Sequence, residues 1–250
     1  MAETHFGYQT IDENEKTARV GEVFSSVAKK YDVMNDVMSF GIHRLWKDWF
    51  VWQTDVQADE RVLDLAAGTG DITARIAKKM CGKGVDISGK ITVSDINEEM
   101  LEVGKKRLLA KGWAHNLEFV IANAEELPFE DNSFDLVTMA FGLRNVTHQQ
   151  KALNEIYRVL KKGGRVLVLE FSAPQNPVFS KVYDWYSFTF LPKMGEVIAK
   201  DAASYQYLAE SIRMMPKQEE LKNMFIAAGF NSCEYQNMTN GIVAIHKGVK

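Results

Sequence analysis

RVLDLAAGTGD (residues 61–71) is the stretch that predicts the fold of this 250-residue chain. Its first half is apolar and indicates a buried strand, and a helical stripe begins directly after it, at Ile72, Ile76, Ala77 and Met80. Between them, Gly68 and Gly70 allow positive φ angles or the close approach of a ligand to the backbone. The free N–H groups of the following helix favour polar or anionic ligand groups. The stretch therefore predicts a strand, a ligand-binding turn and a helix.

Three interpretations of this turn compete. A dinucleotide site requires a third glycine, and Thr73 stands in its place. A loop for S-adenosylmethionine (SAM) has the pattern acidic-x-Gly-x-Gly-x-Gly, which residues 64–70 match with Ala66 instead of the first glycine. An ordinary strand–helix turn is the third interpretation. The SAM loop fits best, and it predicts a cofactor site built from these residues: Asp64, Ala66, Gly68, Thr69 and Gly70.

Composition narrows the class of protein. The chain is 46% hydrophobic, so we expect one domain over residues 1–250. A net charge of −3 argues against a nucleic-acid partner. The two cysteines, Cys81 and Cys233, lie far apart, and no metal-ligand spacing is visible, so we expect neither a disulfide framework nor a metal site. With no signal peptide and no apolar run that could span a membrane, the sequence predicts a cytoplasmic protein that could still contact a membrane peripherally.

Alternating patterns organise the rest of the chain. Residues 61–170 alternate strands and helices, which predicts an α/β fold with a mostly parallel sheet and a ligand at the carboxyl ends of its strands. Residues 216–250 predict a helix followed by a closing hairpin. Two segments fall outside this core. Residues 17–53 show a helical stripe and are predicted to form a lid, and residues 171–215 begin with seven aromatics in twenty positions, which indicates either a packed helix or a cover over an apolar substrate.

Polar residues follow the predicted strands at the places where a ligand would lie. Asp95 ends the second strand, and its carboxylate can accept hydrogen bonds from a ribose diol. Asn123 and Ala124 follow the third strand and could read the edge of adenine. Arg144 and Asn145 follow the fourth strand, where substrate meets cofactor. Arginine stays protonated, so it can hold an anion or orient a water but cannot serve as an ordinary base; a surface salt bridge is the simpler alternative.

Several blocks outside the loop resemble a known family. They are HFGYQT (residues 5–10), KYDVMND (30–36), SFGIHRLWK (39–47), FGLRNV (141–146), YRVLKKGG (157–164) and YQYLAESI (205–212). Together they cover nearly the whole chain and are similar to the UbiE family, the ubiquinone/menaquinone biosynthesis C-methyltransferases. That resemblance implies a class I SAM-dependent methyltransferase fold, with a seven-stranded, mostly parallel Rossmann-like sheet and helices on both faces.

The resemblance also implies an activity and a set of site residues. The reaction would be C-methylation of the ring of a polyprenyl benzoquinol, of demethylmenaquinol, or of both. SAM contacts are implied at Thr69, Asp95, Asn123 and Ala124. The family often has serine where this chain has Ala140, so a hydroxyl contact to the cofactor is lost or replaced here. Arg144 is the candidate for polarising an oxygen or a water, with Asn145 and Tyr31 orienting it.

Competing functions remain open at this point. A NAD-linked oxidoreductase is disfavoured by Thr73. A SAM-binding protein without catalysis, or a methyltransferase that acts on another apolar small molecule, would share the same motifs. A homodimer or a complex of quinone-biosynthesis enzymes is a further expectation for the partners.

Overall fold

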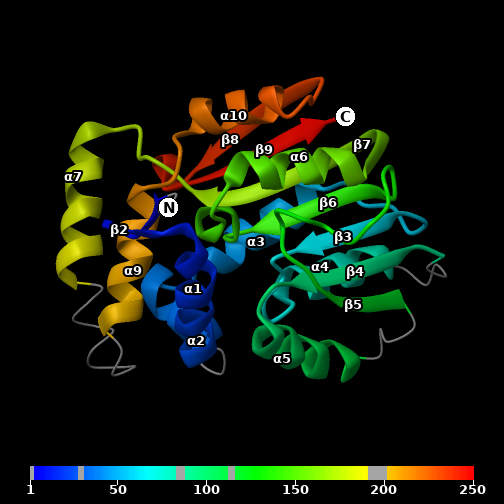
Figure 1. Ribbon diagram of the computed structural model, residues 1–250, viewed down its shortest axis with the longest axis horizontal. Coiled ribbons are helices and arrows are strands. Elements are labelled where there is room, and N and C mark those ends of the chain that lie inside the picture. The colour runs from blue at the N-terminus through cyan, green and yellow to red at the C-terminus, as the bar shows by residue number, and fades with distance from the viewer. Residues whose placement is uncertain (1–2, 28–30, 83–87, 112–115, 191–201) are drawn as a thin grey trace.

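A seven-stranded sheet forms the centre of the molecule (Figure 1). The structure is a computed structural model, and it describes residues 3–27, 31–82, 88–111, 116–190 and 202–250. Strand order is β5-β4-β3-β6-β7-β9-β8. The strands are β3 (Arg61–Leu65), β4 (Lys90–Asp95), β5 (Leu117–Ile121), β6 (Phe134–Ala140), β7 (Leu160–Phe171), β8 (Ser232–Met238) and β9 (Val243–Val249).

The pairing of these strands confirms the predicted fold class. β3, β4, β5, β6 and β7 run parallel to one another, whereas β9 pairs antiparallel with both β7 and β8. Strand order reverses at β3, which has β4 on one side and β6 on the other. In an open α/β sheet, this reversal leaves a crevice beyond the carboxyl ends of the strands. The loop after β3 therefore lies where a ligand is expected.

Helices cover both faces of the sheet. One face carries α3 (Ile42–Gln53), α4 (Asp71–Met80) and α5 (Glu98–Leu109), and the other carries α6 (Gln149–Val159) and α10 (Gln218–Ala227). The stripe of α4 packs as the sequence predicts, with Ile76 and Ala77 buried against β3 and β4. Burying such side chains on each face, at about 1.5–3 kcal/mol each, holds the layers together.

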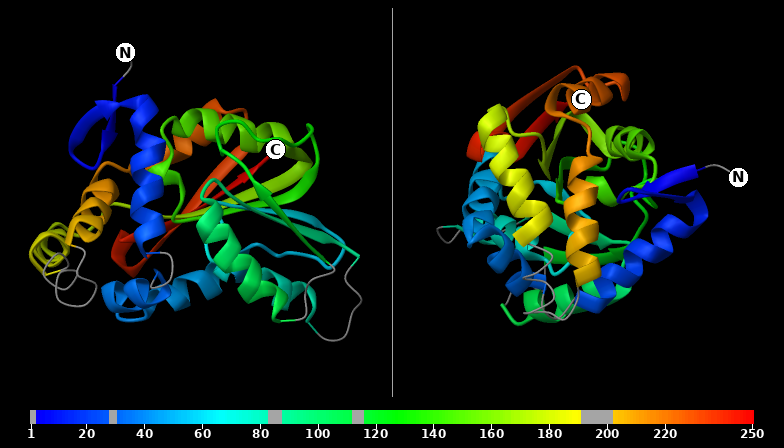
Figure 2. Two further views of the ribbon diagram at one scale, coloured as in Figure 1. Left: turned by 60° about the horizontal axis from the view of Figure 1, so that its bottom comes forward. Right: turned by 90° about the vertical axis from the view of Figure 1, so that its left-hand side faces the viewer.

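A second group of elements stands beyond the carboxyl ends of the strands (Figures 1 and 2). It consists of α1 (Glu13–Val27), α2 (Tyr31–Ser39), α7 (Pro177–Trp185), a π-helical turn η4 (Tyr186–Phe190) and α9 (Ala202–Arg213). A hairpin of β1 (Glu3–Phe6) and β2 (Gln9–Asp12), which periodicity did not predict, docks on α9. Its turn is held by a hydrogen bond from the Tyr8 amide to Glu210 (3.0 Å) and by stacking of Phe6 on Tyr207.

Residues 17–53 are predicted to form a lid, and the structure differs from this prediction at α3. The segment is helical, but α3 packs into the core: Trp46 and Val51 are buried, and Phe50 is fully buried against the sheet. The apolar stripe of α3 is therefore a core surface, and only α1 and α2 stand clear of the sheet layers. The aromatic segment predicted at residues 171–215 contributes α7, η4 and α9 to this same end of the molecule.

Candidate active site

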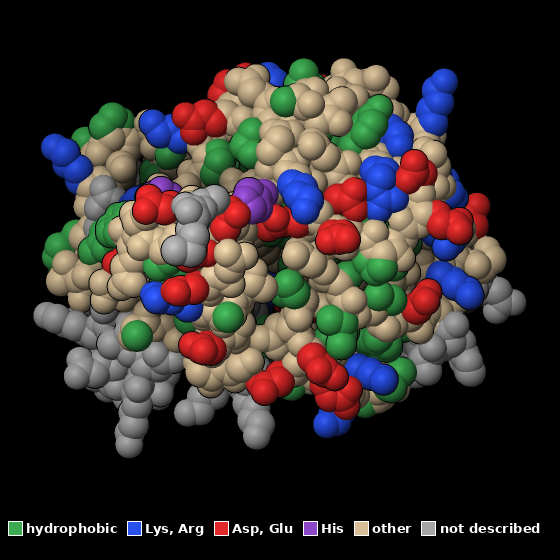
Figure 3. Space-filling view, viewed as in Figure 1, with side chains coloured by type: hydrophobic (Ala, Val, Ile, Leu, Met, Phe, Trp, Pro, Cys, Tyr) green, Lys and Arg blue, Asp and Glu red, His purple; other side chains and the backbone are tan. Residues whose placement is uncertain are grey.

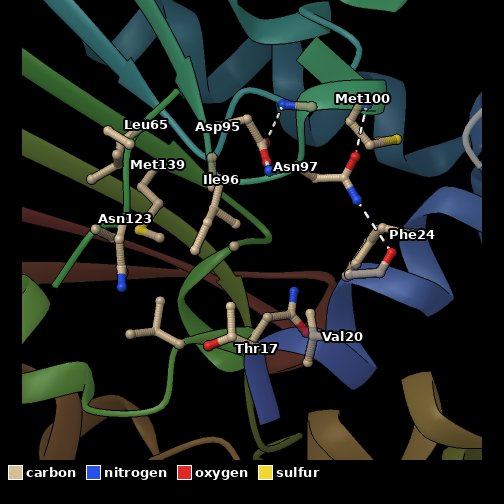
Figure 4. A pocket seen from close by; sticks show the side chains of 18 of the residues that line it. Thr17, Val20, Phe24, Leu65, Asp95, Ile96, Asn97, Met100, Asn123 and Met139 are labelled. Atoms are coloured by element: carbon tan, nitrogen blue, oxygen red, sulfur yellow. Dashed lines mark hydrogen bonds between the residues drawn. The ribbon is translucent and has the colours of Figure 1, made fainter. Parts of the chain in front are cut away.

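A cavity of about 120 Å³ opens at the reversal of strand order; we call it the loop cavity. Six of the predicted cofactor residues line it: Ala66, Gly68, Asp95, Asn123, Ala124 and Ala140. They come from the ends of β3, β4 and β6 and from the segment after β5, because the carboxyl ends of parallel strands meet at one edge. Figure 4 shows Asp95, Ile96 and Asn97 beside the cavity, with Thr17, Val20 and Phe24 across from them.

The loop after β3 is held in a left-handed conformation. Ala66, Gly68 and Gly70 have φ angles of 54°, 54° and 73°. An L residue in this region is strained by about 1–2 kcal/mol, which explains why glycine suits these positions and why Ala66 is unusual. The amide of Ala67 donates to Ser94 O (2.9 Å), which ties the loop to β4. Backbone, rather than bulky side chains, therefore faces the cavity.

Asp95 is a buried carboxylate in the wall of the loop cavity. Its Oδ2 accepts a hydrogen bond from the Gly68 amide and its Oδ1 accepts one from the Asn97 amide, both at 2.8 Å. Burial raises the pKa of Asp95, and these backbone donors oppose that shift. A carboxylate has about four acceptor positions, so acceptor capacity remains for the hydroxyls of a ribose. A buried carboxylate beside a backbone-lined loop fits SAM.

Asp64, Thr69 and Gly70 build the loop instead of lining the cavity. Asp64 is buried beneath it, where the hydroxyls of Thr73 and Thr138 donate to its two oxygens at 2.5 and 2.8 Å. Burial raises the pKa of Asp64 to about 6. Gly70 faces α5, since an added Cβ would lie 2.7 Å from Leu108. Thr69 is buried and is also outside the cavity lining. The lining of the loop cavity does not include these three residues, and direct cofactor contacts by Asp64, Thr69 and Gly70 stay a prediction.

Helix α1 supplies a wall of the loop cavity that sequence reasoning did not assign. Thr17, Val20 and Phe24 line the cavity on one side of α1. Asn97 fixes this wall, because its amide group donates to Gly21 O (3.2 Å) and Ser25 Oγ (3.1 Å) while its oxygen caps α5. The helical stripe of α1 was visible in the sequence, but the surface that it contacts was not.

An acidic and histidine cluster anchors the start of α1; we call it the latch. The Nδ1 of His148 lies 2.7 Å from Glu125 Oε2, and its Nε2 lies 3.0 Å from Glu13 Oε2 of α1. Glu125 also accepts hydrogen bonds from the amides of Thr147 and His148. The hydrogen bond to Glu125 raises the pKa of His148. The latch therefore connects α1 to the segment that follows β6.

A second cavity, of about 350 Å³, lies next to the first; we call it the aromatic cavity. Its lining is mostly apolar and includes Phe40, Trp46, Phe171, Tyr183, Trp185 and Tyr186. Phe141 lines both cavities, which places them side by side. Phe141 has a φ of 57°, a strained conformation of the kind that accumulates at functional sites. The arrangement can hold a flat apolar ring beside a polar cofactor.

Arg144 lies in the wall of the aromatic cavity, and its partners are buried rather than at the surface. Its Nη1 forms an ion pair with Glu170 Oε1 (3.1 Å) and also donates to Phe141 O. The backbone N–H of Arg144 donates to Glu170 Oε2 (3.2 Å). Each of these buried charges offsets the cost of burying the other, because a single unpaired charge in the interior would strongly destabilise the folded protein. The surface salt bridge considered from the sequence is therefore excluded for this pair.

Asn145 and Tyr31 are the other two predicted catalytic residues, and the structure describes the side chain of Asn145 only. Asn145 lines the loop cavity, and its Oδ1 accepts a hydrogen bond from the hydroxyl of Tyr207 (3.0 Å), so its NH₂ group is the donor that it can offer to a ligand. Tyr31 begins α2, but its side chain lies outside the described residues. The side chains of Phe179 and Phe190, from the aromatic segment, also lie outside them.

Comparison with known proteins identifies the family. The model of the ubiE/COQ5 methyltransferase family matches residues 12–250. The chain belongs to the ubiE/COQ5 methyltransferase family. A relative from Pseudomonas fluorescens (strain SBW25), the ubiquinone/menaquinone biosynthesis C-methyltransferase UbiE, is 57% identical over 99% of this chain and 94% of its own length. The UbiE of Pseudoalteromonas translucida (strain TAC 125) is 55% identical over 99% of this chain and 96% of its own length. Membership confirms a methyltransferase whose cofactor is SAM.

Solved structures of low sequence identity share the fold. A SAM-dependent methyltransferase from Aquifex aeolicus has a TM-score of 0.62 at 18% identity, covering 90% of this chain and 97% of that one. The [4+2]-cyclase SpnF has a TM-score of 0.66 at 18% identity, covering 92% and 94%. Since a cyclase appears beside a methyltransferase, the fold alone does not decide the reaction.

Three features of the surface and composition bear on partners. Within the described part of the chain, no helix combines the length and apolar character that a membrane crossing needs. Among the same residues, no group of three or more His, Cys, Asp or Glu side chains could hold a metal ion. Figure 3 shows acidic and basic side chains interspersed over one face of the molecule.

Proposed function

We propose that this protein methylates a ring carbon of a polyprenyl quinol, a benzoquinol, demethylmenaquinol or both, in ubiquinone and menaquinone biosynthesis. The names of its relatives support this reaction. The observation that carries the proposal is the aromatic cavity, which adjoins the loop cavity at Phe141 and has the buried Arg144 in its wall. A flat, apolar acceptor with one oxygen to be polarised matches that lining.

Bound SAM supplies a methyl group on a cationic sulfur. Asp95 holds the ribose, and the segment at Asn123 and Ala124 faces the adenine. Arg144 polarises a quinol oxygen, which makes the neighbouring ring carbon more nucleophilic. Asn145 offers a hydrogen-bond donor from the wall of the loop cavity. Alignment of the two reactants and exclusion of water supply most of the rate acceleration, as expected for an apolar site.

A polyprenyl substrate also brings the protein to a membrane surface in this proposal. Polyprenyl quinols partition into lipid, since each buried CH₂ contributes about 0.8 kcal/mol. Trp185 is 62% exposed and Phe188 39% exposed, and Trp185 also lines the aromatic cavity. We expect these aromatics to lie at the prenyl entrance and to bind liposomes weakly. A homodimer or a quinone-biosynthesis complex stays a prediction, which light scattering of the purified protein tests.

One assay tests the proposed reaction. Purified protein is incubated with methyl-labelled SAM and, separately, a short-chain demethylmenaquinol and a short-chain benzoquinol, and the products are identified by mass. Transfer of the label to a ring carbon of at least one quinol is expected. Binding of SAM without transfer to either quinol would refute the proposal and favour a methyltransferase of another apolar small molecule. Trp185→Ser and Phe188→Ser then test the entrance: activity on a long-tailed quinol should fall, while activity on a short-tailed one is retained.

A further inference from the structure

His43 is a buried histidine in the wall of the aromatic cavity. It lies in the first turn of α3, is 6% exposed, and shares the cavity lining with Arg144. Its Nδ1 is buried and has no hydrogen-bond partner in the part of the chain that the structure describes. Buried polar atoms are nearly always paired, so an unpaired nitrogen on a residue of the cavity wall needs an explanation. His246 also has an unpaired Nδ1, but it lines none of the cavities described above.

The other nitrogen of His43 determines its tautomer. Nε2 lies 2.8 Å from Asp36 Oδ1, and Arg44 binds both oxygens of that carboxylate, at 2.8 and 2.5 Å. The Arg44 guanidinium and His43 hold the pKa of Asp36 well below its usual range. An ionised carboxylate only accepts hydrogen bonds, so the ring hydrogen of neutral His43 is on Nε2. Nδ1 therefore carries the lone pair.

The surroundings keep His43 neutral. Burial lowers its pKa, and the ammonium of Lys47, one turn further along α3, acts in the same direction. Asp36 and Asp71 oppose this, and Lys47 is itself paired with Asp71 at 2.9 Å. The remaining titratable groups of the cavity lining are Arg144, Tyr183 and Tyr186. A neutral imidazole oriented by a carboxylate has the arrangement of a general base.

We propose that His43, oriented by Asp36, is the general base that takes the proton from the quinol hydroxyl. This inference rests on the proposed quinol methylation. The O–H bond breaks, its electron pair stays on the oxygen, and a new bond forms between the proton and Nδ1. The imidazolium then lies against the Asp36 carboxylate, and Arg144 is available to stabilise the oxygen anion. Because 32% of the Asp36 side chain is exposed, the proton has a route through Nε2 and Asp36 to solvent.

This assignment fills a role that Arg144 cannot fill. A guanidinium stays protonated, so it stabilises an anion but does not remove the proton that creates it. The alternative is that the His43–Asp36 pair only fastens α2 to α3. A purely structural pair would affect the folded state but not the ionisation that limits the rate.

The test compares His43→Gln and Asp36→Asn with wild type, and with His5→Gln as a control at an exposed histidine. We expect kcat to fall about 10²–10³-fold in His43→Gln, within the range of general-base catalysis, and less in Asp36→Asn. Affinity for S-adenosylhomocysteine should stay within about threefold. In wild type, kcat should rise with pH through an acidic limb below the ordinary histidine value, and His43→Gln should lose that limb.

Two further measurements keep the inference testable if a variant is unstable. Added imidazole should restore a saturable part of the activity of His43→Ala, which a structural role does not predict. In ¹⁵N-histidine NMR of the wild-type protein, Nε2 should carry the hydrogen. A hydrogen on Nδ1, or a His43→Gln protein with normal kcat and an unchanged acidic limb, would overturn the inference while quinol methylation stands. A wild-type protein that methylates no quinol would overturn both.

Discussion

Replacing Asp95 with asparagine separates cofactor binding from support of the loop. Asp95 accepts hydrogen bonds from the amides of Gly68 and Asn97 and has acceptor capacity left for the ribose. An asparagine keeps one oxygen acceptor, but its NH₂ group would face the N–H donor at the other position. The substitution therefore removes charge-assisted hydrogen bonds to the cofactor and leaves one backbone donor unpaired.

The two effects have different sizes. Losing a charge-assisted hydrogen bond costs about 1.5–3 kcal/mol, which corresponds to about 10- to 150-fold weaker binding of SAM. One unpaired backbone N–H costs about 1–3 kcal/mol of stability, but the buried charge that raises the pKa of Asp95 is removed at the same time. We therefore expect the affinity loss to exceed the loss of stability.

Calorimetry with S-adenosylhomocysteine and thermal unfolding without it measure the two effects, with Asp59→Asn at an exposed loop position as the control. The folded-state pKa of Asp95 is raised, so the stability that its protonation contributes is present at low pH and lost as pH rises through that pKa. The stability of Asp95→Asn relative to wild type should therefore be highest at high pH, where wild type has lost this contribution. A folded Asp95→Asn protein with unchanged affinity would refute the assignment of Asp95 to the ribose.

Four other expectations concern turnover, the N-terminal helices and the residue beneath the loop. Arg144→Lys keeps the charge but loses the planar fork, so kcat should fall about 10²-fold while S-adenosylhomocysteine affinity stays within about threefold; a near-normal kcat would count against any chemical role. Deleting residues 1–53 removes α3, with its fully buried Phe50, and should abolish cooperative thermal unfolding. Deleting only residues 1–27 should leave a folded protein with weakened SAM binding and no turnover, and normal turnover would contradict the lid role of α1. Asp64 has a pKa raised to about 6, so the stability from its protonation is present below about pH 4 and lost as pH rises through 6; Asp64→Asn should remove this dependence in unfolding experiments from pH 4 to 8.

The sequence by itself determined the elements and the edge at which the cofactor site lies. The strand, loop and helix around Gly68 follow from local periodicity. Asp95 and Asn123 line the same cavity, as expected because parallel strands end at one edge of the sheet. Asp64 shows the limit of this reasoning. It belongs to the same motif, yet its side chain points beneath the loop to Thr73 and Thr138, and the motif does not specify that direction.

Only the tertiary structure decided which partner each apolar surface meets. The pattern of α3 is amphipathic in the sequence, but packing decides that Phe50 enters the core while Trp52 stays 63% exposed. The aromatic cavity depends on α2, α3, β7 and α7 meeting at one end of the sheet. A chemical role for His43 follows only from its position in the wall of that cavity. Periodicity is a local property of a segment, whereas a cavity wall is set by side chains that lie more than a hundred residues apart and pack together only when the chain has folded.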